Sequence, residues 1–492
     1  MKIINKNSKI ALVELPPTLY GEYNGDSSQD IFSNFRMPAR STHVLESLLR
    51  RDGWANVKSL NPFYHGNKGK FTKDNESEIF SSDILGISPI TRTSRQSMEL
   101  GKIAKKSNQD IIRLAGGFDA TARASEYLAS NSFDIVIRGE AEKTLPELME
   151  RLTKSGMSDL KEINGISYRA SSREIVHNPE RALLTAEELG KMPHPFYDSK
   201  VRREIITAPI ETTRGCPFSC EFCSVTDFYG RTYRTKPINY VLEELKNIQG
   251  MGKYTFITDD NFAGNPSRTI KLLEAMMDSD IPHKEFGAQV RIEVAKDSQL
   301  LETFKRANLR KLFIGIESIN DDTLKAFNKH ATAKQNMNAV ETLRKEGFWV
   351  HGMLVAGLDY DTPEYFRELA DWANKNLDSM QLFAATPVPG TKFWKEMESQ
   401  DRILTKDFSL YDGFNVVCRP NPEKFTPHSL QESIREVYLD FYSPKNMLKR
   451  VAKSKFKLFS AGLNAYIQFV AKPNALYSNQ ALDHLKFLKS VS

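Results

Sequence analysis

Apolar runs alternate with helical stretches in two separate blocks of the chain, and this alternation constrains the fold more than any other feature. In the first block, four buried runs bounded by Gly or Pro are predicted to be strands, at 9–15, 83–90, 110–117 and 133–140. Stretches with the apolar spacing of helices lie between them, at 41–53, 94–108 and 120–131. This pattern predicts an α/β domain with a doubly wound parallel sheet of the flavodoxin-like (Rossmann) type.

A second alternation begins near Glu204. Six more runs are predicted to be strands, at 204–215, 254–262, 286–293, 311–318, 350–358 and 379–388. The intervening helices are expected at 238–249, 267–278, 298–307, 333–346 and 363–376. Six such units predict a partial (β/α)6 barrel of the TIM type, short of the usual eight units.

These patterns divide the chain into four segments. We expect the doubly wound domain at 1–165, a linker at 166–203, the partial barrel at 204–405 and a mainly helical C-terminal extension at 406–492. The linker is predicted because its sequence is polar and carries prolines near its end.

The composition is that of a globular protein, with 40% hydrophobic and 26% charged residues. The sequence contains no apolar run long enough to cross a membrane, and its start has no signal-peptide cleavage site. We therefore expect a cytoplasmic protein. Four cysteines are too few for a disulfide framework in a chain of 492 residues.

Positive charge is concentrated in the tail. Residues 443–492 hold nine Lys or Arg and one acidic residue, whereas the whole chain has a net charge of only +6. A basic segment interleaved with apolar residues is typical of a helix that contacts an anionic membrane, and equally of a solvated helix packed on the body. Binding to nucleic acid is not expected, because the basic residues are confined to this tail and no nucleic-acid-binding module surrounds them.

Three cysteines lie within eight residues directly after the first strand of the second block. Cys216, Cys220 and Cys223 have the spacing C-x3-C-x2-C, and Cys418 lies far along the chain. A structural zinc site normally has four ligands in paired C-x2-C elements, and no fourth Cys or His follows within about sixty residues. Three thiolates on one loop suit a [4Fe–4S] cluster that keeps one iron open. Cys418 is expected to be a buried or partly exposed thiol of the extension, and a role in radical relay or substrate contact stays open.

The segment "RGCPFSCEFCSV" resembles the signature of the radical S-adenosylmethionine (SAM) superfamily, including the aromatic Phe222 before the last cysteine. The resemblance implies that the three cysteines bind the cluster and that its open iron chelates SAM. Reductive cleavage of SAM then yields a 5′-deoxyadenosyl radical. The other strand ends match positions that contact SAM in this superfamily, although "TDDNF" has acids where glycines are usual. With Phe222, the implied SAM-binding residues are Asp259, Asp260, Asn261, Gln289, Arg291, Glu317, Ser318 and Gly357.

A flavodoxin-like domain before such a barrel resembles the cobalamin-binding subgroup, which includes hopanoid 2-methylase and the anaerobic magnesium-protoporphyrin ester cyclase. The resemblance implies that loops at the strand ends cradle cobalamin. The matching residues are Ser88, Thr91, Gly116, Gly117, Thr121, Gly139 and Glu140. The D-x-H-x-x-G motif that supplies a cobalt-ligating histidine is absent, and His65 lacks its Asp and spacing.

The resemblance implies an enzyme that functionalises an unactivated carbon, with methylation as the leading outcome. A polyprenoid or hopanoid-like lipid is the leading substrate, and a tetrapyrrole or a secondary metabolite stays open. A ferredoxin or flavodoxin would supply electrons, and the basic tail would make peripheral membrane contact. Two alternatives stay open: a non-methylating enzyme of cyclisation or coupling, with or without cobalamin, and a cobalamin or iron–sulfur sensor. A tRNA methylthiotransferase would need a second cluster, for which the cysteines are too few.

Overall fold

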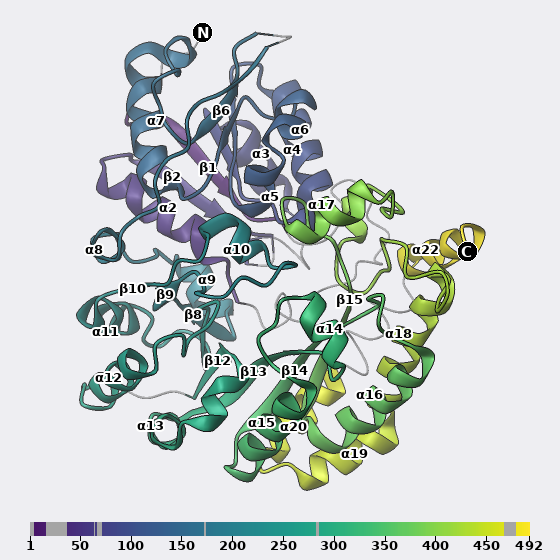
Figure 1. The fold of residues 1–492 in the computed structure, drawn as a ribbon. Helices are drawn as coiled ribbons and strands as arrows, with labels where there is room; N and C mark the ends of the chain where they lie inside the picture. Colours follow the sequence, from purple (N-terminus) through teal and green to yellow (C-terminus); the bar gives the residue numbers. More distant parts are fainter. Residues whose placement is uncertain are drawn as a thin grey trace. The chain divides into compact units, whose positions relative to one another are not determined.

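The computed structural model describes residues 4–15, 37–62, 64–65, 71–171, 174–281, 285–466 and 479–492. The chain falls into two compact units, each with its own largely parallel sheet (Figure 1). Of the described residues, those up to Pro209 and Gly250–Gly252 form the first unit, and those at 210–249 and from 253 onward form the second.

The sheet of the first unit has the strand order β2-β1-β3-β4-β5-β6-β7. Its parallel strands are β1 (Lys9–Val13), β2 (Asn56–Leu60), β3 (Ile84–Ile87), β4 (Ile112–Ala115) and β5 (Ile135–Ile137). Its helices are α2 (Arg40–Arg51), α3 (Lys73–Phe80), α4 (Ser94–Ser107), α5 (Phe118–Ala122), α6 (Ala124–Ala129) and α7 (Ala141–Ser155). The parallel order 2-1-3-4-5 is the flavodoxin-like arrangement, which confirms the predicted fold class.

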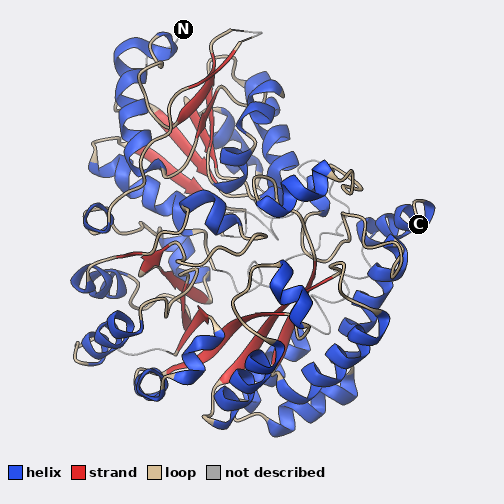
Figure 2. Ribbon diagram, in the orientation of Figure 1, coloured by secondary structure: helices blue, strands red, loops and turns tan. Residues whose placement is uncertain are grey.

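Two apolar cores lie on opposite faces of this sheet. Ile10 and Leu12 of β1 belong to one core, and Ala11 and Val13 to the other, because successive side chains of a strand point to opposite faces. Figure 2 shows helices on both faces of the sheet. A strand covered on both faces must be apolar throughout, which is why these strands appear in the sequence as continuous apolar runs.

Residues 166–203, for which the sequence predicts a linker, lie in the first unit. They contain β6 (Ile166–Arg169), β7 (Ile175–His177), α8 (Ala186–Leu189) and α9 (Ser199–Glu204). β6 pairs antiparallel with β5, and β7 pairs antiparallel with β6. The polar composition of this stretch therefore reflects short strands at a sheet edge rather than a free connector.

The sheet of the second unit has the order β15-β14-β13-β12-β11-β8. Its strands are β8 (Thr207–Ile210), β11 (Tyr254–Ile257), β12 (Phe286–Val290), β13 (Leu309–Glu317), β14 (Trp349–Ala356) and β15 (Ser379–Ala384). Its helices include α10 (Ser224–Tyr229), α11 (Ile238–Asn247), α12 (Pro266–Met277), α13 (Ser298–Arg306), α14 (Asp321–Ala326), α15 (Ala333–Lys345) and α16 (Pro363–Asn376). A short antiparallel pair, β9 (Thr213–Arg214) and β10 (Arg234–Thr235), stands beside them. Six strands in chain order confirm the partial barrel.

The two faces of this sheet differ in exposure. Leu312, Ile314 and Leu382 point to the helix-covered outer face and have no exposed surface. The opposite side chains form what we call the inner face. Register pairs join Gln289 to Phe313 and Phe313 to His351 across it, and both Gln289 and Phe313 stay partly exposed. The inner face therefore keeps accessible side chains where a ligand can bind.

The C-terminal extension is helical, as predicted. Its helices are α18 (Pro427–Phe441), α19 (Pro444–Lys453), α20 (Lys457–Tyr466) and α22 (Asn479–Ser490), and α17 (Lys392–Ser399) precedes it at the end of the barrel segment. Within the described residues, none of the chain's helices has the length and apolar character needed to cross a membrane.

The extension also satisfies the free edge of β15. The backbone N–H of Leu382 donates to the hydroxyl of Tyr438 at 2.7 Å, and the N–H of Met380 donates to the hydroxyl of Tyr442 at 3.1 Å. The N–H of Ala384 donates to the carbonyl of Gly413 at 2.6 Å. These three amides alternate along one strand and face away from β14, so an edge strand that could pair with another chain is covered.

Candidate active site

The cysteine loop follows β8 and β9 and ends where α10 begins. Gly215, directly before the first cysteine, has φ +83°, and a Cβ there would collide with the carbonyl oxygen of Thr232. Only glycine fits this turn. The N–H of Gly215 donates to Asp260 Oδ2 at 3.1 Å, and the side-chain amide of Asn328 donates to the carbonyl of Ser219 at 3.2 Å. The loop is thus held from the end of β11 and from the segment that follows α14.

The three thiols lie in an environment that is shielded from solvent. Cys220 is buried, and Cys216 and Cys223 are half-buried. Burial raises the pKa of the Cys223 thiol to about 11, partly opposed by hydrogen bonds from the amides of Thr226 and Val225. Burial also raises the pKa of Cys216, partly opposed by a hydrogen bond from the Phe218 amide and by the Arg291 charge. Metal coordination favours the thiolate that this environment otherwise disfavours, so the donor set fits an iron–sulfur cluster.

No three His, Cys, Asp or Glu side chains in the described part of the chain surround a site for a single metal ion. A cubane cluster makes a different demand, because each of its thiolates binds a separate iron.

Arg291, directly after β12, brings a buried cation to the cysteine loop. Its Nη1 lies 3.9 Å from Cys220 Sγ, and its guanidinium stacks 3.7 Å from the ring centroid of Phe218. Its other contact is an ion pair with Glu293 at 3.2 Å. A fixed cation here can bind a carboxylate that is brought to the cluster. Gln289, two residues earlier, is partly exposed on the same inner face.

Asp260 and Asp259 are neighbours in sequence but have different surroundings. Asp260 is partly exposed, and its pKa is raised to about 6 by burial and by the charges of Asp259 and Glu211. Asp259 is 1% exposed. Its Oδ1 accepts from the amides of Thr212 at 2.6 Å and Thr213 at 3.1 Å, and its Oδ2 accepts from the Thr212 hydroxyl at 2.6 Å. Asp259 therefore braces two strand ends, while Asp260 faces the cysteine loop.

Glu317 ends β13 in an uncommon conformation. Its φ is +61°, and the register of β13 against β14 shifts between Gly315 and Glu317. Its carboxylate pairs with the buried Lys329 ammonium at 2.8 Å. A Cβ on Gly315 would point to the inner face and would meet Glu317 Oε1 at 2.7 Å. The bulge thus turns this carboxylate over the inner face, and such strained residues concentrate at functional sites.

The other predicted SAM contacts have structural partners. Ser318 is fully buried, and its hydroxyl lies 2.8 Å from that of Tyr365. Gly357 has φ +98°, and its N–H donates to the buried Asp361 at 2.7 Å. The backbone carbonyl of the buried Asn261 accepts from the Tyr233 hydroxyl at 3.2 Å. Their SAM contacts remain predictions, and the structure gives each of these positions a role in shaping its loop.

One half of the inner face is mainly apolar, with Gln381 of β15 beside Met353 in the strand register. Met353, Val355 and Phe383 of β14 and β15 are partly exposed there. Phe414 of the extension continues this wall, with its ring centroid 5.7 Å from that of Phe383. Gly413, before it, has φ +80° and packs against the Phe383 ring, where a Cβ would come within 2.7 Å. The sequence offers no signal for Phe414, because only the path of the extension brings it to the barrel.

Phe222 joins this apolar wall to the cysteine loop. Its ring lies 4.5 Å from that of Phe327, and it packs with Val355 against a cluster that includes Cys418. Cys418 is buried, and its thiol donates to the carbonyl of Ala385 at 3.3 Å. Burial raises the pKa of this thiol to about 12, so it is a neutral packing group.

The predicted cobalamin residues collect at the carboxyl ends of β3, β4 and β5 in the first unit. Gly117 has φ +89°, and a Cβ there would lie 2.8 Å from Ser88 Oγ. Thr121 Oγ1 accepts from the amide of Gly139 at 3.1 Å. Ligands of doubly wound sheets bind at this edge. The remaining predicted residues there are Thr91 and Gly116, which are partly exposed, and Glu140, whose Oε2 accepts from the Leu184 amide at 2.7 Å.

Two further residues near this edge are relevant to the predicted binding of cobalamin. Ile90 is 53% exposed between two of the predicted contacts, so an apolar side chain stands free at the edge. His65 follows β2, but its Nε2 lies 2.7 Å from Asp198 Oδ2 and its Nδ1 accepts from the Asn61 amide at 3.1 Å. Both ring nitrogens of His65 are therefore engaged within the first unit.

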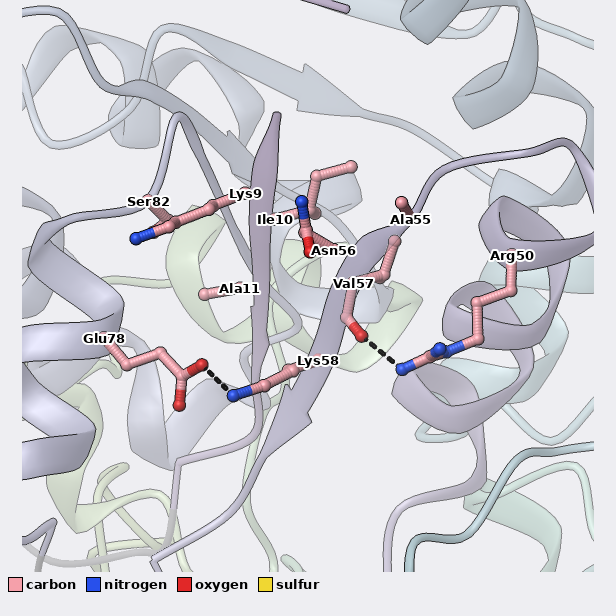
Figure 3. Close-up of a pocket in the computed structure, with 10 residues that line it drawn as sticks. All are labelled: Lys9, Ile10, Ala11, Arg50, Ala55, Asn56, Val57, Lys58, Glu78 and Ser82. Atoms are coloured by element: carbon pink, nitrogen blue, oxygen red, sulfur yellow. Dashed lines mark hydrogen bonds and ion pairs between the residues drawn. The ribbon is translucent and has the colours of Figure 1, made fainter. Parts of the chain in front are cut away.

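A cavity of about 310 Å³ lies at the opposite, amino-terminal edge of the same sheet (Figure 3). Two contacts join lining residues: Lys58 forms an ion pair with Glu78, and Arg50 donates to the carbonyl of Val57 at 2.7 Å. This cavity is separate from the predicted cofactor edge.

Comparison with known proteins assigns the barrel. Residues 210–373 match the model of the Radical SAM superfamily. An uncharacterized methyltransferase of Pyrococcus horikoshii is 28% identical over 76% of this chain and 81% of its own length. The hopanoid C-3 methylase of Methylococcus capsulatus is 28% identical over 64% of this chain and 60% of its own length. A solved structure of the cobalamin-dependent S-adenosylmethionine radical enzyme OxsB, with aqua-cobalamin and S-adenosylmethionine bound, superposes with a TM-score of 0.70. The match covers 98% of this chain and 75% of the OxsB chain at 17% identity, so the fold is shared.

Proposed function

This chain is a radical SAM enzyme with its superfamily domain at residues 210–373, and from this premise we propose that it uses cobalamin to methylate an unactivated carbon of an apolar substrate. The superfamily implies a [4Fe–4S] cluster and SAM. When bound, these supply a 5′-deoxyadenosyl radical, and cobalamin supplies the methyl group. A ferredoxin or flavodoxin is the proposed electron donor.

The polar half of the inner face is suited to SAM. Cys216, Cys220 and Cys223 would hold the cluster. Arg291 offers its cation to the methionine carboxylate, and Asp260, a carboxylate at neutral pH, offers an acceptor to the ammonium. Glu317 and Gln289 are the side chains left on this half to contact the ribose hydroxyls and other polar groups of SAM. Asp259 braces the loop from behind rather than from the inner face.

The carboxyl edge of the first sheet supports the cobalamin proposal. Its loops carry glycines at Gly116, Gly117 and Gly139 and partly exposed hydroxyls at Ser88 and Thr91. A corrin ring carries amide side chains that need hydrogen-bond donors and acceptors nearby. Glycines allow the protein backbone to come close enough to supply them.

The apolar half of the inner face carries the substrate proposal. Met353, Val355, Phe383 and Phe414 form a wall with no charged side chain among them, beside the cysteine loop. A substrate radical needs a site that excludes water and offers few reactive polar groups. A polyprenoid or hopanoid-like skeleton has the matching chemistry.

The test begins with anaerobic reconstitution of the full chain with iron, sulfide and hydroxocobalamin. We expect about four irons and about one cobalt per chain, with iron lost in Cys216→Ala and retained in the matched control Cys418→Ala. Iron without cobalt would refute cobalamin use and with it methylation.

The second step adds a hopanoid or a polyprenol in detergent, with SAM and a strong reductant. Methylation predicts S-adenosylhomocysteine together with 5′-deoxyadenosine. 5′-Deoxyadenosine alone would favour cyclisation or coupling, and no SAM cleavage with any substrate would favour a sensor.

A further inference from the structure

The helices α19 and α20 form a hairpin that is firmly anchored on the second unit. Arg450 of α19 is 4% exposed, and its Nη1 donates to the carbonyl of Phe441 at 2.6 Å. Its Nη2 donates to Asn464 Oδ1 on α20 at 2.9 Å. The guanidinium also stacks 3.7 Å from the Phe441 ring. This one buried cation ties both helices to α18, so the orientation of the hairpin is fixed.

The inward side of α20 packs on the amino ends of the barrel strands. Phe459 lies 5.1 Å from the ring of Trp349, the first residue of β14, and under the Lys311 ammonium at 3.6 Å. Trp349 Nε1 donates to Ser460 Oγ at 3.2 Å. Figure 1 shows both helices at the lower end of the second unit as drawn. These contacts settle which side of the hairpin remains outward.

The outward side combines large apolar side chains with lysines. Leu448 is 71% exposed and Leu458 is 91% exposed, more than any other large hydrophobic side chain in the described residues. The exposed lysines around them are Lys445, Lys449, Lys453, Lys455 and Lys457. Residues 443–466 contain no Asp or Glu. Single exposed leucines are common on protein surfaces, but here the two most exposed large apolar side chains stand among five exposed lysines. A protein partner would need acidic groups to match this many cations.

We propose that this outward face of the α19–α20 hairpin docks on an anionic membrane surface. The leucines would enter the boundary between headgroups and acyl chains, and the lysines would contact anionic headgroups. Each half reinforces the other, because a single weak anchor gives only marginal binding. The proposal goes beyond the proposed function, since it concerns where the enzyme resides and not which carbon it modifies.

The docking face and the active site lie at opposite ends of the barrel. The hairpin covers the amino ends of β13 and β14, whereas the cysteine loop follows the carboxyl end of β8. A strand of nine residues such as β13 spans about 30 Å. Docking would therefore hold the enzyme at the membrane while leaving the site uncovered, and a lipid substrate would have to leave the bilayer to react.

The test is sedimentation of the reconstituted full-length protein with vesicles of phosphatidylcholine alone, or mixed with phosphatidylglycerol. We expect binding to the mixed vesicles that weakens with salt and little binding to phosphatidylcholine. The double variant Leu448→Ser and Leu458→Ser should weaken binding about tenfold or more, as should Lys445→Gln with Lys449→Gln and Lys453→Gln. Met337→Ser, a 39% exposed apolar residue of α15, is the matched control and should bind normally.

Several outcomes would overturn this assignment. The first is absence of binding to the mixed vesicles, and the second is binding by the leucine and lysine variants that equals that of the native protein. The third is self-association of the native protein without vesicles, if the leucine substitutions abolish it. The last would make the face a contact with a second copy of the chain. Iron content and basal SAM cleavage should be unchanged in every variant, which separates failure of this inference from failure of the proposed function.

Discussion

Replacing Asp259 with alanine tests whether two adjacent carboxylates have separate tasks. The change removes the acceptor of two backbone amides and one hydroxyl in a site that is 1% exposed. A hydrogen bond to a charged group contributes about 1.5–3 kcal/mol, so the loss of three such bonds sets the upper limit of the expected destabilisation. Burial raises the pKa of Asp259, which shows that desolvation offsets part of this gain. We expect a loss of about 3–5 kcal/mol in the free energy of unfolding.

The assay is thermal unfolding of the apo protein, followed by iron content after reconstitution. A loss of this size lowers the Tm of a large domain by about 10 °C. Iron loading should fall as well, because Asp259 holds the strand end that leads into the cysteine loop. The matched variant Asp260→Ala loses one acceptor, that of the Gly215 amide, and should shift Tm little while weakening SAM binding. The reasoning fails if Asp259→Ala keeps the native Tm, or if Asp260→Ala binds SAM normally.

Three further predictions concern other parts of the chain. Burial lowers the pKa of His351 from 6.5 to about 4, so the unfolded chain binds a proton in this window that the folded chain does not. The contribution of His351 to the free energy of unfolding is therefore complete above pH 6.5 and falls by about 3 kcal/mol as the pH drops to 4. In urea unfolding at a series of pH values, His351→Gln should lack this part of the pH dependence. Gly315→Ala would push a methyl group against the Glu317 carboxylate, so SAM cleavage should fall with less than about 1 kcal/mol lost in stability; an unchanged rate would contradict the role of Glu317. Gly117→Ala combines a strained φ with a contact to Ser88, so cobalt per chain should fall while iron is retained, and unchanged cobalt would place cobalamin elsewhere.

The sequence predicted the strands that matter for the site because parallel strands covered on both faces appear as unbroken apolar runs. The observed β3 and β4 lie inside the predicted runs at 83–90 and 110–117. By contrast, β6 and β7 lie in the polar stretch at 166–203, where short antiparallel edge strands leave no such run. The predicted strand at 204–215 is shorter in the structure, since helix α9 still occupies Glu204.

Within the site, the sequence predicted which loops matter but not which side chain of each loop faces inward. In "TDDNF" the first aspartate, Asp259, points away from the inner face and accepts from Thr212, whereas the second, Asp260, faces the cysteine loop. In "GIES" a bulge and a left-handed residue turn Glu317 over the inner face, while Ser318 is buried. Such choices depend on bulges and on partners far along the chain, and local periodicity carries no information about them.

The extension solves a problem that the partial barrel creates, and this connects its fold to the proposed chemistry. A sheet of six strands cannot close on itself, so β15 would present a row of free amides to solvent. Tyr438 and Tyr442 accept two of these amides through their hydroxyls, and Gly413 accepts the next through its carbonyl. Because Gly413 must approach the strand this closely, the residue after it, Phe414, is delivered beside Phe383. The same contacts that cover an edge strand therefore build the apolar wall. If the proposed function is right, a change in the extension alters both the stability of the barrel and the substrates it accepts.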